Sequence, residues 1–148
     1  MKIISHRGNL WGAFNPKLEN SVEYINKALL EGFDVEVDVW YNSDKESFFL
    51  GHDTPTYYVD SSFLVDQRLW CHAKNIEAMN RLLSMDANCF WHENDKCTMT
   101  SKGVLWCFPK IWSPMGITVV FDSPNNECLS RDIFGICVND PCEWRKLL

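Results

Sequence analysis

DVEVDVW, residues 34–40 of the chain, alternates acidic and apolar side chains. Because successive side chains of a β-strand point to opposite faces, this alternation predicts a strand that carries Glu36 and Asp38 on one side. At that spacing the two carboxylates lie close enough to share one cation. Their hard oxygen atoms suit Mg²⁺ or Ca²⁺, so the stretch predicts a divalent-cation site.

A second motif lies upstream, where the apolar run of residues 2–6 predicts a short strand that ends at His6. Gly8 lets the backbone turn sharply and approach an anionic group. Arg7, between them, can bind phosphate oxygens in bidentate fashion. The segment therefore predicts an anion-binding turn at the end of the first strand.

A third motif follows the apolar run of residues 47–50, which ends at Gly51-His52-Asp53. His52 is expected to face His6 across the metal site. Histidine titrates near neutral pH, so the two imidazoles form a candidate acid and base pair. Singly, each motif is more typical of a surface histidine or a solvated strand face, and it is their joint order and spacing that favours a catalytic site.

The order of these motifs resembles that of the glycerophosphodiester phosphodiesterases, in which His-Arg, Glu-x-Asp and His-Asp follow one another. The corresponding residues are His6-Arg7, Glu36-Val37-Asp38 and His52-Asp53. Residues 18–21, LENS, resemble the family's Pro-Glu-Asn-Thr segment, and residues 135–141, GICVNDP, resemble its last strand. The resemblance is most specific over the first sixty residues and reaches both ends of the chain.

The resemblance implies a triosephosphate-isomerase-type (TIM) barrel with its site at the carboxyl ends of the strands. It implies a divalent cation held by Glu36 and Asp38, with His6 and His52 as general acid and base. It also implies that the chain is a phosphoric diester hydrolase of lipid metabolism, whose partner is a small phosphodiester substrate.

One departure from the family lies in LWCHAK, residues 69–74, where the family's third strand carries Glu-x-Lys. Lys74 is present and is expected to face the phosphate, but His72 replaces the carboxylate. His72 either ligates the cation, which makes Mn²⁺ or Zn²⁺ more acceptable, or replaces the cation by hydrogen bonding. Glu93 and Asp95 are further candidate ligands, although an acidic loop is the plainer interpretation. The alternative function is a catalytically degraded phosphate-binding or structural module of the same fold.

A second departure is length, since a barrel of this type takes about 250 residues and this chain has 148. The sequence therefore predicts a reduced TIM-type (β/α) barrel with several outer helices replaced by loops. Helical periodicity is clear only at residues 20–31, where Asn20 or Ser21 can cap the start, and at residues 75–85. Strands are predicted at residues 2–6, 34–40, 47–50, 69–73, 88–92, 103–107, 117–121 and 135–138, with 47–50 in a loop excursion. Large aromatic side chains, Trp70, Trp91, Trp106 and Trp112 among them, or a homodimer, can cover the exposed outer faces.

Composition predicts a single soluble domain over residues 1–148, with no integral membrane segment. The first strand begins at residue 2 and leaves no room for a signal peptide. Seven irregularly spaced cysteines without a Cys-x-x-Cys motif favour buried, reduced thiols in a cytoplasmic protein. The net charge of −6 disfavours a nucleic-acid partner, because binding to phosphate backbones draws on surplus Lys and Arg.

Overall fold

The computed structural model describes residues 1–148, which form ten strands and four helices. The strands are β1 Lys2–His6, β2 Asp34–Asn42, β3 Ser47–Leu50, β4 Tyr57–Val59, β5 Leu69–Ala73, β6 Cys89–Phe90, β7 Cys97–Met99, β8 Leu105–Cys107, β9 Gly116–Val120 and β10 Gly135–Val138. The helices are α1 Val22–Leu30, α2 Ile76–Ser84, α3 Asn126–Leu129 and α4 Pro141–Arg145.

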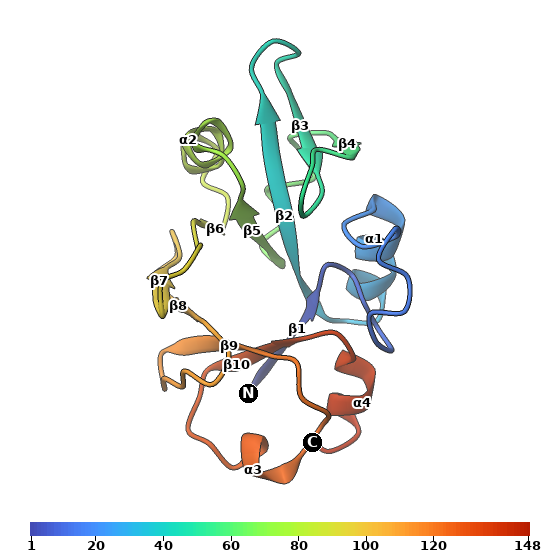
Figure 1. Ribbon diagram of the computed structural model, residues 1–148, viewed down its shortest axis with the longest axis vertical. Helices are drawn as coiled ribbons and strands as arrows, with labels where there is room; N and C mark the ends of the chain where they lie inside the picture. Colours follow the sequence, from blue (N-terminus) through green and yellow to red (C-terminus); the bar gives the residue numbers. More distant parts are fainter.

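The core of the sheet is a curled row of parallel strands in the order β6-β5-β2-β1-β10-β9-β8. Strand β2 is longer than its neighbours, so its second half runs past β1 and pairs with β3 in an antiparallel hairpin (Figure 1). The predicted excursion at residues 47–50 is thus confirmed. Two strands without a sequence prediction, β4 and β7, extend the antiparallel edges beside β3 and β8.

The predicted barrel is not closed. Strand β6 is two residues long and pairs only with β5, and no ladder joins it to β7 or β8. Ser101 bridges the gap through two hydrogen bonds to Cys89. Ser101, in the turn between β7 and β8, accepts from Cys89 N through Oγ (3.0 Å) and donates its own N–H to Cys89 O (2.8 Å). The chain therefore forms a curled open sheet with few helices, because no further strand is available to complete the ring.

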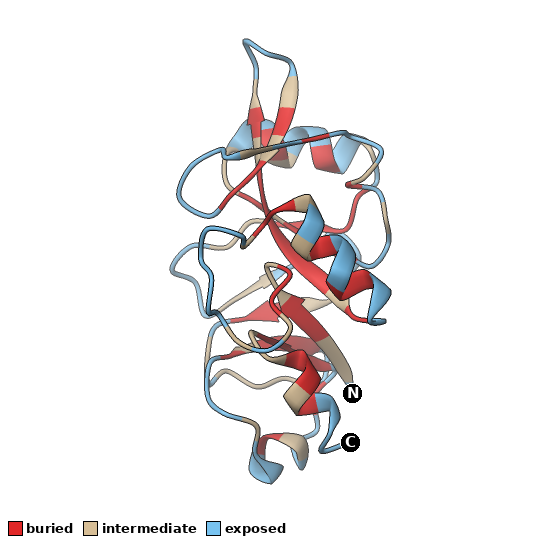
Figure 2. Cartoon of the chain, turned by 90° about the vertical axis from the view of Figure 1, so that its right-hand side faces the viewer, coloured by how far each residue is buried: buried red, intermediate tan, exposed pale blue.

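The alternation in β2 divides the molecule into two layers. Val35, Val37 and Val39 are fully buried on the outer face, where they pack with the apolar stripes of α1 and α2. Both helices turn an exposed side to solvent, which Figure 2 shows clearly for α1. Glu36 and Asp38 face the opposite, inner side, as the sequence predicts.

Stacked aromatic side chains fill the inner side below these carboxylates. The rings of Phe90 and Trp106 stack with centroids 4.5 Å apart, and the Trp70 ring lies 5.9 Å from that of Trp106. Ile4, Ile117 and Cys137 complete this cluster. The sequence predicts that Trp70 and Trp106 help to cover the outer faces of the strands, but in the structure both rings lie in the interior. A curled sheet without full closure needs bulky groups to fill the space that it encloses.

Both predicted helices are present, with Ser21 and Asn75 as their N-caps. Ser21 rather than Asn20 caps α1, through a 3.3 Å bond from Tyr24 N to Ser21 Oγ. Beyond α2, the chain has only the short helices α3 and α4, in agreement with the predicted loss of outer helices. None of the four helices has the length and apolar character that a bilayer crossing requires.

Replacing Phe90 by Ala should lower the free energy of unfolding by about 3–5 kcal/mol, since it removes a fully buried ring of the inner stack and leaves a cavity. Urea unfolding followed by circular dichroism measures the change. Phe14→Ala is the matched control, because Phe14 is 85% exposed and its loss should change stability by less than about 0.5 kcal/mol. Equal losses in the two variants would contradict the assignment of Phe90 to the interior.

Candidate active site

Neighbouring parallel strands bring the predicted site residues together at their carboxyl ends. His6, the last residue of β1, is the register partner of Glu36 on β2, and Asp38 is the register partner of His72 on β5. Their side chains share the inner face of the sheet. The structure thus joins three segments, His6-Arg7, Glu36–Asp38 and His72–Lys74, into one polar cluster above the aromatic stack.

Asp38 is the centre of this cluster and is completely buried. Its carboxylate lies 3.0 Å from Arg7 Nε, 3.2 Å from His72 Nδ1 and 3.6 Å from Lys74 Nζ. Burial acts to raise the pKa of Asp38, but the hydrogen bond from His72 and the charges of Arg7, His72 and Lys74 outweigh burial and hold the pKa well below its usual range. Asp38 is therefore a stable anion surrounded by cations.

Asn20 holds Asp38 in place, a role that the sequence does not reveal. Its Nδ2 donates to Asp38 Oδ2 (2.9 Å), and its Oδ1 accepts from Asp38 N (2.8 Å). Asn20 has a φ of 63°, in the left-handed region, where Asn is among the more tolerated residues. The only sequence signal for this role is the likeness of LENS to the family's Pro-Glu-Asn-Thr segment.

His72 has a fixed orientation. Its Nε2 lies 2.8 Å from the backbone oxygen of His92, which can only accept, so Nε2 carries a hydrogen and donates. Nδ1 consequently faces the carboxylates, 3.2 Å from Asp38 and 3.7 Å from Glu36. Burial lowers the pKa of His72, but the bonds and charges of Asp38 and Glu36 outweigh it and raise the pKa to about 9.

Glu36, Asp38 and His72 can hold a metal ion, because one ligand atom from each lies within 4.8 Å of the others. Glu36 Oε2 is buried without a hydrogen-bond partner, and the only cationic contacts of the buried Asp38 Oδ1 are those with His72 and Lys74. Because Nε2 of His72 donates to the His92 carbonyl, the lone pair of the neutral ring lies on Nδ1, which is then the ligand atom. Contacts of this kind with a carbonyl commonly orient histidines that bind metals. The donor set therefore fits a divalent cation. His72 thus belongs to the candidate donor group, whereas Glu93 and Asp95 are exposed and do not.

His6 is held by a chain of side-chain bonds that fixes its tautomer. Asn9 Nδ2 donates to Glu19 Oε1 (2.8 Å) and to Asn139 Oδ1 (3.2 Å), so the Asn139 atom that faces His6 is an oxygen. His6 Nδ1 must then donate to it, at 2.7 Å. The Nε2 atom of neutral His6 keeps its lone pair and lies 3.8 Å from Glu36 Oε2. Asn139 follows the last strand, and its contact with residue 6 is too distant in sequence to be predicted.

Arg7 lies in the sharp turn predicted at Gly8. Gly8 has a φ of 85°, and a Cβ atom there would lie 2.8 Å from the backbone of Tyr24, so only glycine fits. Arg7 Nε faces Asp38 and Nη1 donates to Glu19 (3.1 Å). The Arg7 guanidinium, which the sequence predicts to bind phosphate in bidentate fashion, thus contacts protein carboxylates instead. Only its Nη2 atom has no carboxylate partner.

His52 lies apart from the cluster, on the loop between β3 and β4. Its side chain is 45% exposed and its Nδ1 is 2.7 Å from Asp53 Oδ1. No hydrogen bond or ion pair joins it to His6. His52 lines a cavity of about 370 Å³ together with Glu19 and Asn20. These two residues contact Arg7 and Asp38, but none of His6, Arg7, Glu36, Asp38, His72 and Lys74 lines the cavity itself. A larger cavity of about 590 Å³ lies at the amino ends of the strands, around Asp34, and contains none of the predicted site residues.

Without metal, the stability of the protein should fall as pH rises from about 6.5 to 9. The folded-state pKa of His72 is raised to about 9, so its contribution is complete below the unfolded value near 6.5 and is lost as the folded ring deprotonates. A shift of this size corresponds to roughly 3 kcal/mol. Urea unfolding in the presence of EDTA across this pH range measures it. His72→Gln, which can donate to Asp38 without titrating, should abolish the slope, and an unchanged slope would contradict the assignment to His72.

Comparisons with known proteins agree at the level of fold. No protein-family model and no curated protein sequence matches the chain. Among solved structures, a glycerophosphodiester phosphodiesterase from Agrobacterium tumefaciens matches with a TM-score of 0.62 and 14% identity, over 99% of this chain and 98% of that one. A protein from Galdieria sulphuraria that carries the same name provisionally matches with a TM-score of 0.61 and 11% identity, over 99% and 96%. The chain therefore has the fold of the glycerophosphodiester phosphodiesterases, in a reduced and open form.

Proposed function

We propose that the chain is a member of the glycerophosphodiester phosphodiesterase family that hydrolyses small phosphodiesters with the help of a divalent cation. The observation that supports this most strongly is the buried donor group of Glu36, Asp38 and His72 beside an imidazole, that of His6, whose Nε2 is free. The group lies at the carboxyl ends of the strands, where enzymes of barrel folds have their active sites. The likeness of fold to two glycerophosphodiester phosphodiesterases adds support.

Glu36, Asp38 and His72 would hold the cation. Their two carboxylates suit Mg²⁺ or Ca²⁺, and the imidazole makes Mn²⁺ acceptable as well. When bound, such an ion polarises a phosphoryl oxygen and offsets charge that develops on it.

The charges of the cluster agree with this role. Three carboxylates, those of Glu19, Glu36 and Asp38, meet two cationic side chains, Arg7 and Lys74, which leaves one surplus negative charge when His72 is neutral. A bound divalent cation reverses this surplus to a single positive charge. A phosphodiester carries one negative charge, so the loaded site would be neutral when the substrate binds.

The chain's own residues supply the remaining chemistry. His6 accepts a proton from the attacking hydroxyl through Nε2, because Asn139 keeps the other nitrogen protonated. Lys74 Nζ and Arg7 Nη2 bind phosphate oxygens. His52, on the loop between β3 and β4, donates a proton to the leaving alcohol.

A second candidate function is a metal-free phosphate-binding module of the same fold. The observation that favours it is the pKa of His72, which Asp38 and Glu36 raise to about 9 against the effect of burial, so that a proton on the ring can replace the cation. A binding module would need Arg7 and Lys74 but no acid and base pair. Activity and metal binding separate the two functions.

Hydrolysis of bis(p-nitrophenyl) phosphate and of glycerophosphodiesters should require Mg²⁺, Ca²⁺ or Mn²⁺ and stop in EDTA. His52→Ala and His6→Ala should each lower kcat by about 10²–10⁴-fold, the usual contribution of a general acid or base. Lys45→Ala, at the exposed tip of the β2–β3 hairpin, is the control and should retain full activity. A folded protein without turnover in any metal would contradict the hydrolase and favour the binding module.

Metal binding should release a proton near pH 7.5, because the ion replaces the hydrogen that His72 Nδ1 shares with the carboxylates. Calorimetric titration with Mn²⁺ in buffers of different ionisation enthalpy measures the number of protons released. His72→Gln should bind at least about tenfold more weakly and release none. Binding of equal strength in that variant would exclude His72 as a ligand, and no binding to the wild type would support the metal-free alternative.

A further inference from the structure

Cys97 and Cys107 face each other across the hairpin of β7 and β8. They are register partners in this antiparallel pair, and their Sγ atoms lie 3.0 Å apart. Both are free thiols, and no other pair of cysteine sulfurs in the chain is joined by a hydrogen bond. Two sulfur atoms that are not bonded ordinarily pack farther apart than this, so the pair calls for a chemical interpretation.

The hydrogen bonds of the hairpin place this pair where a disulfide can form. Phe108 N donates to Lys96 O (2.8 Å) and Thr100 N donates to Val104 O (2.8 Å), so bonded pairs occupy every second register position. Cys97 and Cys107 fall between them, in a pair that exchanges no backbone bonds. Cα atoms in such pairs are about 4.5 Å apart, which is within the range of about 4.4–6.8 Å that a disulfide spans.

We propose that Cys97 and Cys107 form a site of reversible oxidative modification, at which a small disulfide such as oxidised glutathione converts the two thiols into a cross-strand disulfide. The Cys97 thiolate attacks one sulfur of the oxidant and releases one glutathione thiolate. Cys107 then loses its proton and attacks the Cys97 sulfur, which forms the protein disulfide and releases the second glutathione. The two protein thiols lose two electrons and two protons, which the oxidant gains as two thiols.

The exposure of the two cysteines sets this order of events. Cys97 is partly exposed, whereas Cys107 is fully buried against the sheet. Burial and the neighbouring Cys97 raise the pKa of the Cys107 thiol to about 12, so Cys107 stays protonated until its partner has reacted. Cys97 is therefore the thiol that meets the oxidant, and Cys107 is the resolving thiol.

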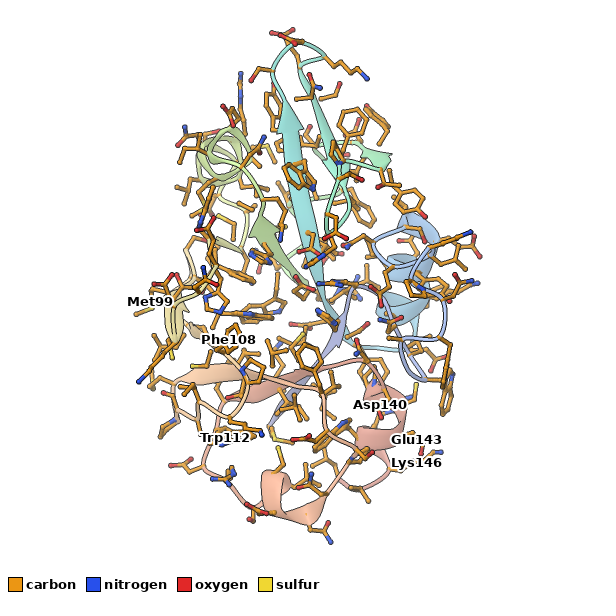
Figure 3. The ribbon with its side chains drawn as sticks, in the orientation of Figure 1. Met99, Phe108, Trp112, Asp140, Glu143 and Lys146 are labelled. Carbon is orange, nitrogen blue, oxygen red and sulfur yellow. The ribbon has the colours of Figure 1, made fainter.

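The bond would also hold the loop that orients His72. Residues 91–96 join β6 to Cys97, and within them the His92 carbonyl accepts from His72 Nε2. Phe108, which follows Cys107 and is marked beside β8 in Figure 3, has its ring 5.8 Å from that of His92. A disulfide would join Cys97, which directly follows this loop, to Cys107, which directly precedes Phe108. It would thereby restrain both His92 and the Phe108 ring that contacts it.

The test counts thiols in the whole folded protein and does not depend on hydrolase activity. After equilibration with oxidised glutathione and removal of the oxidant, denatured wild type should contain five titratable thiols where the reduced protein contains seven. Its mass should fall by that of two hydrogen atoms, and peptide mapping should find residues 97 and 107 bridged. Retention of all seven thiols, or a bridge between other cysteines, would overturn the proposal.

Two single variants check the order of events. Cys107→Ser should stop at a glutathione adduct on Cys97, whereas Cys97→Ser should react at neither position, because the buried Cys107 does not meet the oxidant. Adduct formation at Cys107 in the second variant would refute the assigned order. Hydrogen exchange gives the structural readout, since amides of residues 91–96 should exchange more slowly in the oxidised wild type. Unchanged exchange there would refute the link to His92, and peptide mapping of the wild type stays decisive if a variant does not fold.

Discussion

The burial of the Asp38 carboxylate is the constraint on which the rest of the site depends. A buried anion costs several kcal/mol unless charges and hydrogen bonds surround it. Here Arg7, His72 and Lys74 surround the carboxylate and Asn20 Nδ2 donates to it, while Asn20 Oδ1 accepts from the backbone N–H of Asp38. These partners come from the turn after β1, the end of β5 and the segment before α1, so the need to neutralise one charge fixes the relative positions of three distant segments.

Strand β2 links this polar centre to the stability of the fold. Its valines anchor α1 and α2 on the outer face, while its carboxylates organise the inner one. A shift of the strand by one residue would exchange the two faces and bury charge among the helices, which strongly selects the observed register. The aromatic stack of Trp70, Phe90 and Trp106 fills the space below the carboxylates, so the site is packed against buried apolar side chains.

Local sequence patterns predict much of this arrangement. The alternation in residues 34–40 predicts the two faces of β2, and the caps of α1 and α2 lie within one residue of their expected positions. The partners of His6 and His72 could not be predicted, for two different reasons. Asn139 lies 133 residues from His6, and the His92 group that fixes His72 is a backbone carbonyl, which any residue type supplies. The open edge at β6 also escapes sequence patterns, because it depends on which strands fail to meet.

Ser101 is one of the residues that hold the open edge at β6 to the β7–β8 hairpin. In a closed barrel, each strand is held to both neighbours by a ladder of backbone bonds, whereas here β6 is joined to the next hairpin by the hydrogen bonds of Ser101 and by the stacking of Phe90 on Trp106. The free energy needed to separate β6 from this hairpin is that of these hydrogen bonds and one stacked ring pair, rather than that of the whole fold. We therefore expect thermal opening of the curled sheet to begin between Cys89 and Ser101, while the strands that carry Glu36 and Asp38 stay paired with their neighbours.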